Sequence, residues 1–341
     1  MSEQLPNPGY RFLGDGMASF TTFFRNDLLP RFTNDQLARQ ADAALLETGP
    51  GRHAMTCDSF IVDPLIFPGG NIGTLAFCGV ANDLLTECAR PESMLMSLMV
   101  AEDLEPSILD TVLDSLSRLC QVTGSAIVGG DTKNLPAGSP QLIISMSAVG
   151  RVGRLGSPLG FEHVEPGDSV VLTGPVGAHS IAVLSSREGL GFESVVRSDC
   201  RDLGATMLPM VRSSPHLHAL RDATRGGVLA VLHELTSSHD LEVVVDVAEI
   251  PVDNEVLMAC DLLGLDPLEL ANEGCMVLFV ESTGAAAMVE ALRSEYGFTR
   301  ACVIGGVAET SHGVGGLVLL VRDGETRVAS QSFGTGIPRL C

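Results

Sequence analysis

The chain has 341 residues, enough for two domains that each build a core. Hydrophobic residues make up 45% of it and aromatic residues only 4%, which predicts aliphatic cores and argues against disorder and against base stacking on aromatic side chains. A formal charge of −21 argues against a nucleic-acid backbone or an anionic membrane as partner.

The N-terminal stretch MSEQLPNPGY has neither the basic nor the apolar region of a signal peptide, and no apolar run reaches the roughly 18 residues that cross a membrane. We therefore expect a cytoplasmic protein. The nine cysteines include no CxxC pair, which argues against a zinc site of the usual spacing. We expect eight of them to be reduced and buried, the exception being the last residue, Cys341.

The first half of the chain mixes helical and extended patterns. Residues 17–47 favour helix with a break near Pro30, and residues 106–122 favour an amphipathic helix. The other elements that we predict are a helix over about 72–88 and strands over 53–62, 93–101, 125–130 and 141–152. Glycine and proline then become frequent, which places a domain boundary near 155–165.

The second half continues without strict alternation of strands and helices, so the predicted class is α+β. Strands are expected over 168–174, 242–250, 275–281, 301–309 and 316–322, and helices from about 178 and over 203–213, 226–238, 254–263 and 283–294. After Arg322 the chain becomes polar and glycine-rich. The predicted organisation is an N-terminal helical segment 1–48, domains 49–155 and 156–322, and a flexible tail 323–341.

Four short stretches set polar residues against glycine or apolar neighbours, and each holds an aspartate. They are TCDS with Asp58, the pair Asn82-Asp83 inside an apolar helix, GGDTK with Asp131, and RDATRGG with Asp222. A buried carboxylate needs a partner, and Mg²⁺ takes carboxylate and phosphate oxygens together. Each aspartate alone fits a helix cap or a turn equally well, but the set favours a phosphate and metal site.

Paired glycines strengthen that interpretation. Gly129-Gly130 and Gly226-Gly227 let a ligand approach the backbone closely, and the second pair opens a helix whose first amides attract phosphate. Arg225 supplies a charge beside it. The chain contains neither a Walker A loop nor a Rossmann fingerprint. Asn272, Glu273 and Lys133, taken one at a time, fit turn and surface positions.

Together these motifs resemble the ATP-binding superfamily of aminoimidazole ribonucleotide (AIR) synthetase, thiamine-monophosphate kinase and selenophosphate synthetase, and most closely its HypE family of hydrogenase maturation factors. The stretches that carry the resemblance run from about residue 55 to the end: TCDSFIVDPLIFPGGNIGTLAFCGVANDL, GGDTK, RDATRGG, GLDPLELANEG and PRLC. The resemblance implies a two-domain PurM-like fold, with N-terminal domains pairing in a dimer sheet or barrel, a C-terminal α/β sandwich domain, and ATP bound between the halves.

The resemblance also implies a reaction. A carbamoyl group delivered by the carbamoyltransferase HypF to the C-terminal thiol is dehydrated with ATP to a thiocyanate. The cyano group then passes to the HypC–HypD complex, which builds the cyanide ligands of [NiFe]-hydrogenase. The implied roles are carrier thiol for Cys341, proton handling for Lys133 and Glu273, Mg²⁺ ligands for Asp58, Asp83 and Asp222, and nucleotide binding for Asn82, Asp131, Thr132, Arg225, Gly226, Gly227 and Asn272.

The end of the chain, GTGIPRLC, fits a carrier role, because a mobile thiol can reach a site that a core cysteine cannot. One stretch departs from the family: where its members commonly have a turn of the type HGSGG, this chain reads FLGDGMAS, with Asp15 between Gly14 and Gly16. Three alternatives stay open. They are a superfamily kinase or synthetase acting on a free small molecule, a paralogue that makes a nitrile on another target, and a non-catalytic scaffold for HypC–HypD.

Overall fold

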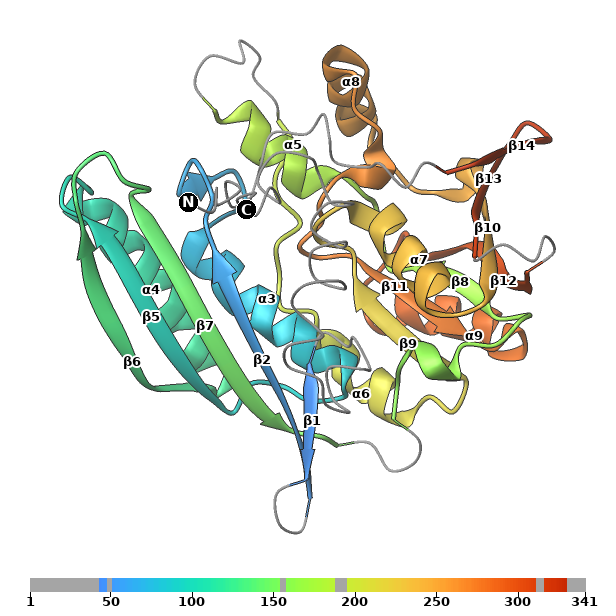
Figure 1. The fold of residues 1–341 in the computed structure, drawn as a ribbon, viewed down its shortest axis with the longest axis horizontal. Coiled ribbons are helices and arrows are strands. Elements are labelled where there is room, and N and C mark those ends of the chain that lie inside the picture. Colours follow the sequence, from blue (N-terminus) through green and yellow to red (C-terminus); the bar gives the residue numbers. More distant parts are fainter. Residues whose placement is uncertain (1–42, 48–50, 154–157, 188–194, 311–315, 330–341) are drawn as a thin grey trace, which may run out of the picture.

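A computed structural model describes residues 43–47, 51–153, 158–187, 195–310 and 316–329. The predictions for the helix before residue 43, for the turn at Gly14-Asp15-Gly16 and for Cys341 lie outside these residues. The chain builds two separate β-sheets with helices packed on them (Figure 1), so the predicted α+β class is confirmed. Among the described residues, no helix has the length and apolarity to span a bilayer.

The N-terminal sheet has five strands in the order β1-β2-β7-β5-β6. Their bounds are β1 Ala44–Glu47, β2 Arg52–Phe60, β5 Ser93–Ala101, β6 Ala126–Leu135 and β7 Leu142–Arg151. Only β5 and β6 run parallel, and β6 is an edge strand. One face of the sheet is covered by α3 (Ile72–Thr86) and α4 (Pro106–Thr123), and a short hairpin, β3 (Ile66–Phe67) with β4 (Gly70–Asn71), leads into α3.

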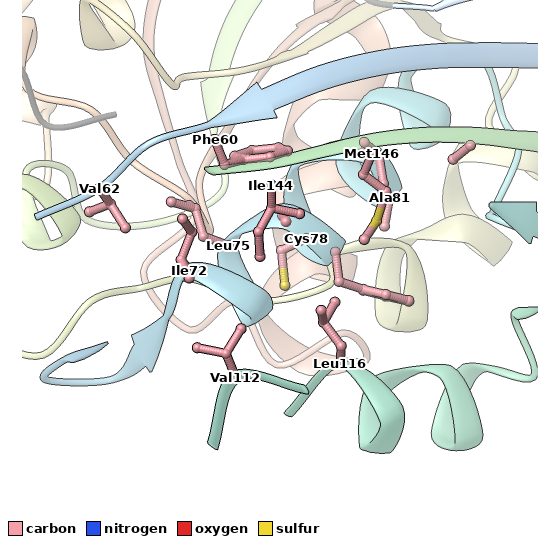
Figure 2. Close-up of a cluster of buried hydrophobic side chains, with 14 of the residues drawn as sticks. Phe60, Val62, Ile72, Leu75, Cys78, Ala81, Val112, Leu116, Ile144 and Met146 are labelled. Atoms are coloured by element: carbon pink, nitrogen blue, oxygen red, sulfur yellow. The ribbon is translucent and has the colours of Figure 1, made fainter. Parts of the chain in front are cut away.

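A buried hydrophobic cluster fills the space between this sheet and its helices (Figure 2). Strand residues Phe60, Ile144 and Met146 contact the α3 residues, and Val112 and Leu116 join them from α4. The sheet therefore has one face committed to a core. The other face carries the alternate side chains of every strand.

Helix α3 lies between the two sheets (Figure 1), and 14 of its 15 residues are buried. Asn71 caps it: the side-chain Oδ1 accepts hydrogen bonds from the backbone N–H of Gly73 and Thr74, and the Thr74 hydroxyl accepts one from the Asn71 N–H. A helix that is apolar on all sides belongs to a core. Polar residues inside it must therefore find partners within the protein.

The C-terminal sheet has seven strands in the order β14-β13-β10-β12-β8-β11-β9. The strands are β8 Ser169–Leu172, β9 Leu217–Asp222, β10 Leu241–Asp246, β11 Met276–Val280, β12 Cys302–Glu309, β13 Val318–Arg322 and β14 Glu325–Val328. The helices are α5 Ala178–Ser185, α6 Gly204–Ser213, α7 Gly227–Ser238, α8 Asn254–Leu263 and α9 Ser282–Ser294, with short 3-10 turns η3 Phe161–His163, η4 Val247–Glu249 and η5 Pro267–Glu269.

Four sequence predictions differ from this fold. Residues 44–47, which we predicted to be helical, form β1, because backbone pairing with β2 outweighs the helix propensity of Ala, Leu and Glu. The strand predicted over 125–130 continues to Leu135, so GGDTK lies within β6. Strand β9 was not predicted. The start predicted for the flexible tail, residue 323, is too early, because β14 pairs with β13.

The cysteines only partly follow the prediction. All eight cysteines that the structure describes are free thiols, in agreement with the expected reduced state. Burial was expected for all eight, yet the structure buries four, Cys78, Cys88, Cys260 and Cys275. Cys57 is exposed, because it lies on the face of the N-terminal sheet that the helices leave open.

Candidate functional site

Asn82 joins the two domains from the middle of α3. It is 2% exposed, and its side-chain Nδ2 donates to the backbone carbonyl oxygens of Arg201 at 3.2 Å and Glu273 at 3.4 Å. Its Oδ1 accepts from the backbone N–H of Leu203 at 2.9 Å. An amide inside an apolar helix is thus used to hold two loops of the C-terminal domain.

Asp58 and Asp83 lie between β2 and α3. The Thr56 hydroxyl of β2 donates to Asp83 Oδ2 at 2.6 Å. Asp58 is two residues further along the same strand, so its side chain points to the same, helix-covered face. A Cβ added to Gly79 of α3 would lie 3.9 Å from Asp58 Oδ2, which places this carboxylate against the helix.

Glu273 lies in the turn that enters β11, and it is 6% exposed. Burial raises its pKa well above the ordinary value, and the nearby groups Cys200, Asp222, Asp199 and Asp58 raise it further. A carboxyl group with a raised pKa beside other acids at a domain junction is a common property of catalytic acids and bases.

Asp222 ends β9, opposite Met276 of β11, and α7 begins five residues later. Gly226 and Gly227 precede and start this helix with φ of +75° and +61°, in the left-handed region that glycine tolerates. A Cβ at Gly227 would lie 2.4 Å from the Leu268 carbonyl oxygen, so space also requires glycine there. Arg225, just before them, is exposed.

Asn272 is fully buried, and its side chain is bonded to backbone on three sides. Its Oδ1 accepts from Gly177 N–H at 2.6 Å, and its Nδ2 donates to the carbonyl oxygens of Ala223 and Leu270, both at 2.9 Å. These contacts fix the turns around Glu273. Contact between the Asn272 amide and a nucleotide stays a prediction.

Asp131, Thr132 and Lys133 lie at the other side of the N-terminal domain, on exposed positions of the edge strand β6. Lys133 Nζ is 2.8 Å from Asp131 Oδ2, and this hydrogen-bonded lysine, together with the Thr132 N–H, lowers the pKa of Asp131. Three strand spacings, about 14 Å, separate β6 from β2.

The β6 motif also faces away from Asp58. Registered partners across the sheet are Asp131 with Ser97, Ser97 with Ser145, and Ser145 with Ser59, whose hydroxyls are 2.7 Å apart. Paired residues share a face and consecutive residues alternate, so Asp131 and Lys133 lie on the open face with Ser59. Asp58 lies on the covered face. One chain therefore keeps Lys133 and the Asp58–Asp83 pair on opposite sides of its sheet.

The carboxylates that we predicted as magnesium ligands come from β2, α3 and β9. In the described part of the chain, no three His, Cys, Asp or Glu side chains are grouped closely enough to hold a metal by themselves. Mg²⁺ usually takes only one or two protein carboxylates and completes its shell with water and phosphate oxygens. The donor set therefore fits a metal that binds together with a nucleotide.

A shallow hollow at the C-terminal end of α3 holds none of the predicted site residues; its lining includes Thr86, Glu87, Leu159, Phe161 and Arg221. We therefore assign the site from the side chains around Glu273.

Sequence reasoning missed the segment 196–203, which lies directly beside Glu273. Asp199 accepts hydrogen bonds from two backbone amides of the Glu273 turn. The pKa of Cys200 lies well above its ordinary value, mainly because of a hydrogen bond with the Cys78 thiol and secondly because of burial. His179, fully buried, contacts Ser198 Oγ through Nδ1 at 2.8 Å, and desolvation lowers its pKa to about 4. The segment begins outside any helix or strand, so periodicity gave no signal; the charged cluster Arg197-Ser-Asp-Cys-Arg-Asp202 was the one available indication.

Comparison with known proteins agrees with this architecture. The chain matches the N-terminal domain of AIR synthase related proteins over residues 40–152 and their C-terminal domain over residues 165–318. It is 36% identical over 324 residues to the carbamoyl dehydratase HypE of Rhodobacter capsulatus, covering 94% of this chain and 92% of that protein.

Two solved structures extend the comparison. HypE in a HypE–HypF complex superposes with a TM-score of 0.82 at 33% identity, covering 90% of this chain and 99% of the other. The hydrogenase maturation protein HypE in complex with ATP gives a TM-score of 0.79 at 33% identity, covering 96% and 98%.

Proposed function

Because the chain belongs to the HypE family of carbamoyl dehydratases, we propose that it dehydrates, with ATP, a carbamoyl group carried as a thiocarboxamide on Cys341. The product is a thiocyanate, which supplies cyanide for the iron of [NiFe]-hydrogenase. The observation that best supports this proposal is Glu273, an acid with a raised pKa that lies beside Asp58 and Asp222 at the junction of the two domains.

The proposed reaction has two stages. The carbamoyl oxygen attacks the γ-phosphorus of ATP, the bond to the β-phosphate oxygen breaks, and ADP leaves. The C–O bond then breaks, phosphate leaves, and the nitrogen loses both protons as the C≡N bond forms. The balance is R–S–CO–NH₂ plus ATP giving R–S–C≡N, ADP, phosphate and one proton. The first stage makes a good leaving group, and the second needs a base within hydrogen-bond reach of the nitrogen.

We propose that Glu273 and Lys133 together handle the protons and the charge of the dehydration step. As a carboxylate, Glu273 can take a proton from nitrogen and then hold it, because burial and the neighbouring acids raise its pKa. Lys133 is a cation at an exposed position, and it can counter the charge that develops on the phosphorylated oxygen.

For nucleotide binding, we propose that Asp58, Asp83 and Asp222 hold Mg²⁺ and that Arg225, Gly226, Gly227, Asn82, Asp131 and Thr132 contact ATP. When bound, the metal neutralises charge on the triphosphate and on the carboxylates around Glu273. Asn272 supports this site through its backbone contacts. The N-terminal amides of α7 are suitable donors to a phosphate, because four amides at a helix start have no partner inside the helix.

The opposite placement of Lys133 and Glu273 favours a homodimer. Their side chains cannot meet within one chain if the sheet separates them, whereas a second copy docked on the open face can bring its Lys133 to the first copy's Glu273. Leu95, Val128 and Met55 expose 52%, 63% and 44% of their surface on this sheet, which suits an apolar interface. We therefore propose a dimer in which each active site takes Lys133 from one chain and Glu273 from the other.

Cys341 reaches the site through the residues after Ala329. The difference 341 − 329 gives 12 residues, with a maximum reach of about 40 Å at roughly 3.3 Å each. We propose HypF as the carbamoyl donor and HypC–HypD as the acceptor of the cyano group. The cytoplasmic location expected from the N-terminal sequence stays a prediction.

Mass spectrometry of the C-terminal peptide tests the proposal. The chain is incubated with HypF, carbamoyl phosphate and Mg-ATP, and Cys341→Ala serves as the control. We expect a carbamoyl adduct on Cys341 that loses one water only when ATP is present. ATP hydrolysis without any adduct, in the presence of active HypF, would contradict the proposal and favour a free small-molecule substrate.

A further inference from the structure

The turn formed by Glu273 and Gly274 has every backbone polar group bonded by residues outside its strand. The Glu273 N–H donates to Asp199 Oδ1 at 3.1 Å, and the Gly274 N–H donates to Asp199 Oδ2 at 2.9 Å. The Glu273 carbonyl oxygen accepts from the Arg201 N–H at 3.2 Å and from Asn82. The Gly274 carbonyl oxygen accepts from Arg201 Nη2 at 3.2 Å. This turn is therefore fixed mainly by Asp199 and Arg201.

Gly274 allows this contact because it has no side chain. A Cβ at this position would lie 1.9 Å from the Asp199 carbonyl oxygen, far inside van der Waals contact. The backbones of Asp199 and Gly274 thus touch, and the Asp199 side chain reaches over to the two amides. No larger residue at 274 keeps the same geometry.

Asp199 is itself held in place by its neighbours along the chain. The Ser198 N–H donates to the Pro68 carbonyl oxygen at 2.8 Å, and Ser198 Oγ contacts His179 Nδ1 at 2.8 Å and accepts from the Cys200 N–H at 3.1 Å. The Arg201 guanidinium lies 4.5 Å over the Phe298 ring. The segment 198–201 is thus attached to both domains before it meets the Glu273 turn.

An enclosed carboxylate in this position is costly. Desolvation raises the pKa of Asp199, and the hydrogen bonds from Glu273 and Gly274 partly offset this effect. Both oxygens already accept a backbone hydrogen bond, so Asp199 is poorly suited to bind a metal or to take a proton from substrate. Its contacts suit a role that acts through Glu273.

We propose that Asp199 is a positioning residue for the dehydration: its two carboxylate oxygens fix the backbone of Glu273 and Gly274 and so set the direction of the Glu273 side chain. This inference rests on the proposed function for its kinetic consequence, but not for its structural one. If Asp199 acts only through Glu273, its loss matters only while Glu273 is present.

The kinetic test is a double-mutant cycle with Asp199→Asn and Glu273→Gln in the full chain, carbamoylated by HypF and supplied with Mg-ATP. Asparagine keeps one acceptor oxygen but places an NH₂ group against the second amide. We expect Asp199→Asn to lower kcat for dehydration at least 30-fold, to change KM for ATP less than threefold, and to have no further effect in the Glu273→Gln background. Independent, multiplicative losses, or a kcat equal to that of the wild type, would overturn the proposal.

Hydrogen exchange of the Glu273 and Gly274 amides tests the same claim without any activity measurement. We expect faster exchange at both amides in Asp199→Asn, with no change in Asp202→Asn, a control whose carboxylate accepts from the Ala205 N–H at 3.2 Å in the same segment. Unchanged exchange in Asp199→Asn contradicts the proposal. If the wild-type chain shows no dehydration at all, the proposed function fails, while the exchange experiment still decides the role of Asp199.

Discussion

The Glu273 turn and the β6 motif are both predicted parts of one active site, yet they differ in almost every physical respect. Glu273 is 6% exposed, and its backbone is bonded to two other segments. Lys133 and Asp131 have side chains that are 65% and 59% exposed, on an edge strand that pairs on one side with β5 and has no partner strand on its other side among the described residues. The Glu273 turn, which one chain encloses by itself, is therefore the finished half of the site. The β6 motif, which one chain leaves open to solvent, is the exposed half. This difference supports the proposal that a second molecule completes the exposed half.

The largest expected effect belongs to the finished half. Glu273→Gln removes the base while keeping a side chain of the same size, so we expect the dehydration rate to fall about 1,000-fold. The melting temperature should stay the same or rise, because a carboxyl group is removed from among Asp58, Asp199 and Asp222. Single-turnover rates and thermal melts measure both quantities. A variant that retains more than a tenth of the rate contradicts the role of Glu273 as base.

His179 gives the finished half a dependence on pH. Its pKa is about 4 in the folded chain and about 6.5 in the unfolded chain, so within this window the unfolded state binds a proton that the folded state rejects. The free energy of unfolding should therefore fall as the pH is lowered from 6.5 to 4, by about 3 kcal/mol from this residue.

Denaturation curves at several pH values measure this contribution against variants. In His179→Gln, the free energy of unfolding should fall by about 3 kcal/mol less than in the wild type between pH 6.5 and pH 4. Equal slopes for the wild type and His179→Gln would show that His179 does not contribute.

The exposed half should respond in activity and not in stability. Lys133→Met removes the cation and its pairing with Asp131, and we expect dehydration to slow about 100-fold. Unfolding should change by less than about 0.5 kcal/mol, because exposed ion pairs contribute little. A clear fall in the free energy of unfolding of Lys133→Met would contradict this account, because it would mean that Lys133 stabilises the fold.

Asn82 and Thr132 form the matched pair for stability alone. Asn82→Ala removes the side chain that bonds the Leu203 N–H and the Arg201 carbonyl oxygen, and it removes one of the two donors to the Glu273 carbonyl oxygen, so we expect a loss of about 2 kcal/mol in chemical denaturation. Thr132→Ala changes an exposed residue of β6 and should stay within about 0.5 kcal/mol. Similar losses in the free energy of unfolding for the two variants would contradict the view that the buried half of the site stabilises the fold and the exposed half does not.

The sequence predicted much of this fold, because most elements carry a clear hydrophobic pattern. The amphipathic helix at 106–122 appears as α4, with Val112 and Leu116 buried as expected and Ile108 and Leu119 packed against the same core. The errors concern β1, β6, β9 and β14, each of which is an edge strand of its sheet. Such strands exist through pairing with a neighbour and carry little pattern of their own.

The candidate site was predictable in its residue types and less so in its geometry. Asp58 and Asp83 were recognised as unusual because charged residues interrupt apolar elements, whereas Glu273 received its role from the family resemblance alone. The structure brings Asp58 near Glu273. Asp199 escaped notice, because it lies in a coil, and its importance arises from contacts with residues about 75 positions away. The face of the sheet on which Lys133 lies also depends on the strand register, which local sequence does not determine.

The measurement that tests the central claim most directly is complementation between two inactive variants. Lys133→Met and Glu273→Gln chains are mixed under conditions that exchange subunits, and dehydration is compared with each variant alone. If each site takes Lys133 from one chain and Glu273 from the other, half of the dimers are mixed and each has one intact site, so about a quarter of the wild-type activity should return. Exchange verified by mass spectrometry, with no gain in activity, would contradict a site shared between two chains.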